Sequence, residues 1–144
     1  MPDAANLDAA YRATTYRVYA PDAIDLTIGA RSAALDGLLE ERRADAWAFM
    51  TAWNPGSRQF TEAENARRQA ELLALLRDRG FEWLAGSGVP ARPDWQPEES
   101  VLVLDVGCDE AIAIAQEFGQ VAIVAGKRGG AAELVYCDRT PAAP

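Results

Sequence analysis

A chain of 144 residues has the length of one ordinary domain, and 49% apolar with 25% charged residues is the composition of a globular protein. Fourteen basic residues against twenty-two acidic ones give a net charge of −8. That charge argues against nucleic-acid partners and anionic membrane surfaces, which require concentrated positive charge. Histidine is absent, so the Ser-His-Asp triad, the usual Cys-His pair and every zinc site with a histidine ligand are excluded.

The chain ends and the two cysteines bear on the compartment. The acidic N-terminus lacks the basic segment and apolar run of a signal peptide, and no stretch approaches the ~20 apolar residues of a membrane helix. Cys108 and Cys137 form no C-x-x-C motif and are interpreted as small buried apolar side chains in a reducing compartment. We therefore expect a cytoplasmic location, a flexible N-terminal segment at 1–14, a single domain at 15–137 and a flexible tail at 138–144.

The first elements alternate between strand and helix patterns. Residues 16–20 and 24–28 each alternate apolar and polar side chains, which predicts two adjacent strands. The one-sided apolar pattern of 32–43 predicts a helix with Ser32 as its N-cap. Residues 46–53 are apolar on both faces, which predicts a central strand covered on both sides of the sheet.

The next helix has the clearest signals in the chain. Thr61-Glu62-Ala63-Glu64 is a capping box, and it predicts a helix over 61–79. The leucine stripe of this helix continues toward its N-terminus as Asn65 and Gln69. Because an unpaired buried amide costs about 1–3 kcal/mol, both side chains must bond to protein or to a ligand.

The second half predicts a loop followed by strands around one helix. Residues 86–99 hold three prolines, two glycines and no periodicity, which predicts a long loop. The expected elements are strands at 81–85, 101–106, 121–125 and 133–137 and a helix at 109–118, with Asp109 as its cap. The whole pattern predicts a single α+β domain with a mixed β-sheet and about three helices.

Asn54 stands where the central strand ends. The proline after it predicts an extended backbone at Asn54, and the ends of such strands bind ligands in open α/β sheets. The alternative is that Asn54-Pro55-Gly56-Ser57 is only a good turn. Asn65 allows the same two interpretations, since it can hold the loop backbone or contact a ligand.

Polar residues also border the later core strands. Trp95, Glu98, Glu99 and Ser100 precede a buried strand, and Gln120 stands between a helix end and a core strand. In the structural interpretation the two glutamates are solvated loop charges and Gln120 caps a sheet edge. In the functional interpretation they face a ligand.

Several of these segments together resemble one known family. They are Thr51-Ala52-Trp53-Asn54-Pro55, Asn65 in the next helix, Gly86, Glu98-Glu99-Ser100 and Phe118-Gly119-Gln120. In this order they resemble the bacterial domain-of-unknown-function family DUF3293, over about Tyr16 to Val135. Either Glu98 or Glu99 matches the motif glutamate. The resemblance implies where a polar constellation lies and implies no reaction or substrate.

These residues support two hypotheses. We expect the polar residues of these segments to converge at one end of the sheet, where they form a polar pocket under the loop before residue 99. The candidate ligand-binding residues are Asn54, Asn65, Trp95, Glu99, Ser100 and Gln120. The preferred hypothesis is a binding module for a small molecule or a peptide segment, because amides and hydroxyls position a ligand without titrating. The alternative is a histidine-independent hydrolase or transferase with Glu98 or Glu99 as general base, and with Ser100 as a candidate catalytic residue beside Glu99.

No cofactor and no metal are predicted. Gly86-Ser87-Gly88 is not a dinucleotide fingerprint, since Val89-Pro90 follows it instead of a helix. The chain also lacks the dense cluster of Asp and Glu that divalent-metal sites require.

Overall fold

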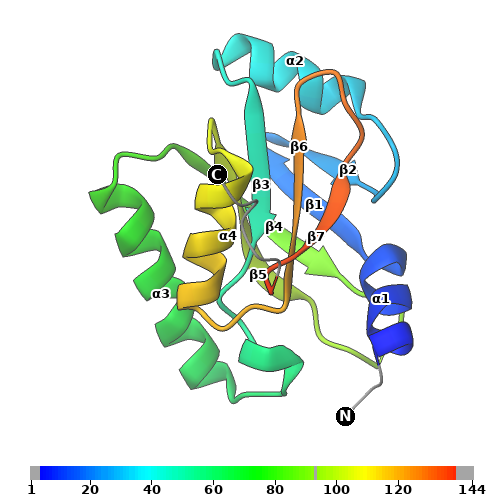
Figure 1. Ribbon diagram of the computed structural model, residues 1–144, viewed down its shortest axis with the longest axis vertical. Coiled ribbons are helices and arrows are strands. Elements are labelled where there is room, and N and C mark those ends of the chain that lie inside the picture. The colour runs from blue at the N-terminus through cyan, green and yellow to red at the C-terminus, as the bar shows by residue number, and fades with distance from the viewer. Residues whose placement is uncertain (1–3, 93, 139–144) are drawn as a thin grey trace.

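The computed structural model describes residues 4–92 and 94–138, which form one seven-stranded sheet and its covering helices (Figure 1). The strand order is β2-β1-β4-β5-β3-β6-β7, and all six neighbouring pairs are antiparallel. The strands are β1 (Thr15–Ala20), β2 (Asp22–Leu26), β3 (Ala46–Met50), β4 (Trp83–Val89), β5 (Glu98–Leu104), β6 (Ala122–Lys127) and β7 (Glu133–Tyr136). The helices are α1 (Ala4–Ala13), α2 (Ala33–Glu41), the short 3₁₀ turn η1 (Pro55–Ser57), α3 (Glu62–Asp78) and α4 (Cys108–Glu117).

The sheet curls until its two edges meet at one end. Ile28, just after β2, forms an isolated parallel bridge with Ala132, just before β7. The Gly29 N–H donates to the Ala132 carbonyl at 2.8 Å, and the Ala132 N–H donates to the Ala30 carbonyl at 3.1 Å. This bridge is the parallel element of an otherwise antiparallel sheet.

Each face of the sheet has its own core. On one face, Leu72 of α3 and Ile114 of α4 pack with alternate residues of β5 such as Val101. In Figure 1 these two helices lie beside each other, away from α1. On the other face, inside the curl, Leu39 of α2 packs with Leu102, since successive strand residues point to opposite faces. The four residues of β3 after Ala46 are all buried, as a strand covered on both sides requires.

The α+β single domain is confirmed, and the differences lie at element ends. The loop predicted at 86–99 is shorter, because β4 continues to Val89 by pairing with β1 and β5 at once. Helix α4 begins at Cys108 with Gly107 as its N-cap, so the prediction of Asp109 as cap is wrong. Cys137 is buried, whereas Cys108 is exposed, and both are free thiols.

Helix α1 is an element that the sequence pattern does not predict. Its contacts to the domain include two hydrogen bonds and one ring contact: the Tyr16 hydroxyl donates to the Tyr11 carbonyl at 2.7 Å, the Tyr136 hydroxyl bonds Asp8, and the rings of Tyr11 and Tyr136 meet edge to face. Such contacts leave no apolar periodicity to read. The flexibility expected for 1–14 stays a prediction, and of the tail only Asp138 belongs to the described residues. No helix within 4–92 or 94–138 combines the length and apolarity needed to span a membrane.

Candidate functional site

Asn54 is the centre of a hydrogen-bonded loop between β3 and α3. Its backbone is left-handed, with φ 48° and ψ 59°, so the prediction of an extended conformation is wrong. Asparagine tolerates this region better than other non-glycine residues. The Asn54 N–H donates to Asn65 Oδ1 at 2.9 Å, and Asn54 Oδ1 accepts from Asn65 Nδ2 at 3.0 Å and from the Phe60 N–H at 2.9 Å. Three hydrogen bonds therefore hold a backbone conformation that Pro55 alone would not favour.

The amides predicted on the buried face of α3 are indeed buried. Asn65 is 2% exposed and Gln69 is 1% exposed. Gln69 Oε1 accepts from the Ala52 N–H at 3.0 Å, one turn along α3 from the Asn65–Asn54 pair. Both side chains therefore bond the backbone that follows β3, which fixes the end of that strand against the first turns of α3.

Gln120 joins the same loop from the other side. Its Nε2 donates to the Trp53 carbonyl at 2.9 Å and to the Phe118 carbonyl at 3.3 Å. The Gly56 N–H donates to the Gly119 carbonyl at 2.8 Å. The turn between α4 and β6 is thus tied to the loop around Asn54.

Glu98, the first residue of β5, brings a carboxylate to this loop. Asn54 Nδ2 donates to Glu98 Oε2 at 3.0 Å. Burial raises the pKa of the partly buried Glu98, and the hydrogen bond from Asn54 offsets only part of that effect. In the described part of the chain no basic side chain forms an ion pair with Glu98.

The strand register sets Glu98 in a row with a glycine and a tyrosine. Gly88 of β4 pairs with Glu98 on one side and with Tyr16 of β1 on the other. Directly paired residues point to the same face, so Tyr16 and Glu98 flank the position where Gly88 has no side chain. A Cβ placed on Gly88 would have only Ser100 Oγ within 4 Å, at 3.9 Å. We call Tyr11, Tyr16, Asn54, Gly88 and Glu98 the Glu98 cluster.

Tyr11 of α1 completes this cluster. Its hydroxyl shares a 2.9 Å hydrogen bond with Ser57 Oγ. Burial raises the pKa of Tyr11 and Tyr16, and the nearby negative charge of Glu98 raises both further. The phenols and the carboxylate are therefore electrostatic neighbours, although they come from α1, β1 and β5.

The comparisons with known proteins concern this same region. The family described as "Protein of unknown function (DUF3293)" matches residues 50–123, more than half of the chain. The chain belongs to the DUF3293 family. No curated protein and no solved structure matches it significantly. The DUF3293 match runs from the end of β3 into β6, so it contains Asn54, Gly88 and Glu98, while Tyr11 and Tyr16 lie outside it.

The structure separates the two neighbouring glutamates, Glu98 and Glu99. Glu98 points to the Asn54 side, whereas Glu99 is exposed and only its backbone carbonyl joins the network, accepting from Thr51 Oγ1 at 2.6 Å. Ser100 is 2% exposed, and its hydroxyl donates to the Glu98 carbonyl at 2.9 Å. Alternation along β5 thus makes Glu98 the glutamate that faces the site.

Among the described residues, no side-chain hydrogen bond or ring contact joins Trp95 to the other predicted site residues. Its side chain is 52% exposed on the loop between β4 and β5, and the Arg92 guanidinium lies 6.0 Å from the ring centre. Tyr11, Tyr16 and Gly88 are the cluster residues that sequence reasoning missed. Tyr16 falls on the inward side of a predicted strand, but no local signal pairs that strand with residue 88.

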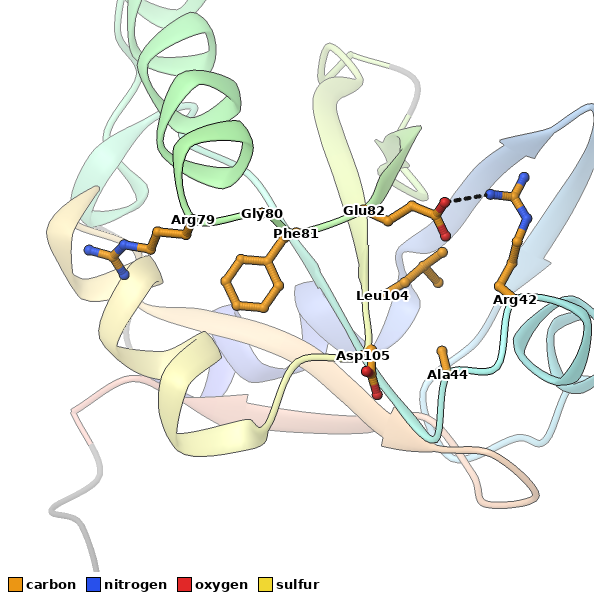
Figure 2. Close-up of a pocket in the computed structure, with 8 residues that line it drawn as sticks. All are labelled: Arg42, Ala44, Arg79, Gly80, Phe81, Glu82, Leu104 and Asp105. Carbon is orange, nitrogen blue, oxygen red and sulfur yellow. Dashed lines mark ion pairs between the residues drawn. The ribbon is translucent and has the colours of Figure 1, made fainter.

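A separate hollow of about 410 Å³ lies at the opposite end of the sheet (Figure 2). It contains none of the predicted site residues. Three of its four charged side chains form ion pairs, Arg42 with Glu82 at 3.0 Å and Arg79 with Glu117 at 3.4 Å, whereas Asp105 has no ion pair among the described residues. The lining residues are Arg42, Ala44, Arg79, Gly80, Phe81, Glu82, Leu104 and Asp105.

The raised pKa of Glu98 predicts a pH-dependent effect of Glu98→Gln. Between the ordinary value of 4.5 and the raised pKa, the unfolded chain has released a proton that the folded chain still holds. The stability of the wild type relative to Glu98→Gln should therefore fall as pH rises through this window, and then level off. Tyr11 and Tyr16, which face Glu98 from α1 and β1, titrate far above it, and Asn54 does not titrate.

Urea unfolding of both proteins at several values between about pH 4 and 8 measures this difference. The matched variant Glu99→Gln removes the same charge from an exposed neighbour and should stay within about 0.5 kcal/mol of the wild type at neutral pH. Parallel stability curves for the wild type and Glu98→Gln would contradict the burial of this carboxylate.

Proposed function

We propose that this DUF3293 chain is a binding module whose small-molecule ligand contacts the Glu98 carboxylate. One observation carries the proposal: the partly buried Glu98 carboxylate has no counter-charge. Among the described residues, Asn54 is its one side-chain donor, and no basic residue forms an ion pair with it. Taking a carboxylate out of water is costly unless hydrogen bonds and a counter-charge compensate for it. A bound ligand supplies that compensation.

The side chain that binds Glu98 is itself held in place, as a site that positions a ligand requires. Asn54 is itself held by Asn65, so its Nδ2 reaches Glu98 from a fixed side chain. Fixed polar groups of this kind bind a ligand without the entropy cost of ordering them first. A scaffold role accounts for Asn65, Gln120 and the oxygen of Gln69, whose partners include backbone groups. It leaves the carboxylate unexplained, and it also leaves the buried Gln69 Nε2 without a hydrogen-bond partner among the described residues.

A histidine-independent hydrolase or transferase remains the second candidate, with Glu98 as general base. The raised pKa of Glu98 favours it, since a base works best when its pKa approaches the working pH. Glu99 is exposed, and the Ser100 hydroxyl is committed to a backbone carbonyl, so neither supports a catalytic role. The net charge of −8 supports a module without nucleic-acid or membrane partners.

A thermal-shift screen with a mixed library of neutral, cationic and anionic small molecules tests the binding module. We expect hits whose Kd rises at least about tenfold in Glu98→Gln, because hydrogen bonds to a charged group contribute about 1.5–3 kcal/mol, and stays unchanged in Glu99→Gln. Hits that are insensitive to Glu98→Gln, or an absence of hits, would overturn the proposal.

A parallel screen of ester, amide and phosphoester substrates tests the second candidate. Turnover that Glu98→Gln abolishes at unchanged Tm would establish the enzyme instead of the binding module. Turnover that survives Glu98→Gln would remove Glu98 as the base.

A further inference from the structure

Building on this proposed function, we propose that the ligand carries a protonated primary amine. Its ammonium group lies over Gly88, between the Glu98 carboxylate and the Tyr16 phenol. Three features of the molecule support this position: the space over Gly88, the hydrogen-bonding state of the surrounding oxygens and the missing counter-charge of Glu98.

The space comes from the register of three strands. Tyr16, Gly88 and Glu98 are direct neighbours across β1, β4 and β5. With strands ~4.8 Å apart, the backbones of Tyr16 and Glu98 are ~10 Å apart, and only a glycine stands between them. On the side-chain side of Gly88, the Ser100 hydroxyl is the one group within 4 Å of a Cβ position.

The oxygens around this space are acceptors whose own hydrogens are already donated. The Tyr16 hydroxyl donates to the Tyr11 carbonyl at 2.7 Å, and the Ser100 hydroxyl donates to the Glu98 carbonyl at 2.9 Å. Glu98 Oε2 accepts from Asn54, while Oε1 has no protein donor among the described residues. A ligand group here must therefore donate, and an ammonium donates three hydrogen bonds from one atom.

The charges around Glu98 favour a cation as the ligand group. In every ion pair of the described residues, an arginine binds an acidic residue other than Glu98. The chain as a whole carries a net charge of −8. An anionic ligand would meet the carboxylate with like charge. A neutral donor would leave that charge uncompensated, whereas an ammonium satisfies both requirements.

The test is an NMR titration of the ¹⁵N-labelled full chain with n-butylammonium. We expect saturable shifts at the Gly88 and Glu98 amides. Three matched probes separate the contributions: n-butanol lacks the charge, butyrate reverses it, and tetramethylammonium keeps it without N–H donors. Each should bind at least about tenfold more weakly than n-butylammonium, since charge-assisted hydrogen bonds contribute about 1.5–3 kcal/mol.

Three variants locate the site. Glu98→Gln removes the charge, and Gly88→Val fills the space, so each should weaken n-butylammonium binding at least about tenfold. Glu99→Gln, on the opposite side of β5, should leave the Kd within about twofold, as distant surface changes do. The same spectra show whether each variant is folded, which keeps loss of binding distinct from loss of structure.

The results of these titrations distinguish a failure of the ammonium proposal from a failure of the proposed binding function. If n-butanol or butyrate binds in a Glu98-dependent manner and n-butylammonium does not, the proposal of an ammonium ligand is wrong, while the proposed binding module stands. If tetramethylammonium binds as tightly as n-butylammonium, the donor argument is wrong. If neither these probes nor the screening library shows Glu98-dependent binding, both proposals fail.

Discussion

Replacing Gly86 with alanine is expected to lower the free energy of unfolding by about 2–3 kcal/mol, the upper part of the range for overpacked cores. A Cβ on Gly86 would lie 2.7 Å from the Arg17 carbonyl oxygen and 2.9 Å from Phe49 Cε2. The carbonyl belongs to the neighbouring strand β1, so it cannot move without disturbing the pairing of β1 and β4. Urea unfolding followed by circular dichroism measures the loss.

Gly88→Ala is the matched control, two residues along the same strand and on the same face. Its Cβ would meet only Ser100 Oγ, at 3.9 Å, so its stability should stay within about 0.5 kcal/mol of the wild type. Equal losses for the two variants would show that the space over Gly88 is closed in solution. That result would also count against the ammonium position.

Replacing Asn65 with leucine is expected to destabilise the fold by about 2–3 kcal/mol, through loss of hydrogen bonds rather than volume. The substitution removes the acceptor of the Asn54 N–H and the donor to Asn54 Oδ1. Because Asn65 is 2% exposed, water cannot readily take its place. Thermal and urea unfolding measure the loss, and the Asn54 amide should lose its protection in hydrogen exchange.

Gln59→Ala is the control for this prediction, because Gln59 is an exposed amide in the same loop. It should change stability by no more than about 0.5 kcal/mol. A loss for Asn65→Leu as small as that of Gln59→Ala would mean that the Asn54–Asn65 pair does not hold the end of β3. The fixed position of Asn54, on which the proposed binding site depends, would then lose its support.

The two sets of residues around β3 thus have different roles. Asn65, Gln69 and Gln120 bond the backbone and fix the loop. Glu98 accepts a hydrogen bond from Asn54, whose side chain Asn65 holds in place, and one carboxylate oxygen has no protein donor among the described residues. The structural explanation therefore accounts for Asn65, Gln120 and the oxygen of Gln69. Of these side chains it leaves two groups over: the buried Gln69 Nε2, which has no hydrogen-bond partner among the described residues, and the Glu98 carboxylate, which motivates a ligand.

The sequence by itself determined the local features of this protein. The capping box at 61–64 predicts the start of α3, where the Thr61 hydroxyl accepts from the Glu64 N–H at 3.2 Å. The helical period places Asn65 and Gln69 on the buried face. These features follow from interactions within a few residues, so a local pattern is enough to read them.

Only the tertiary structure decided how the site is assembled. Sequence alternation says that Glu98 and Glu99 point in opposite directions, but not which of them faces Asn54. The choice depends on the register of β5 with β4 and of β4 with β1, which sets Tyr16, Gly88 and Glu98 in one row. Register between strands more than 60 residues apart, such as β1 and β4, depends on the packing of the whole curled sheet and leaves no local trace.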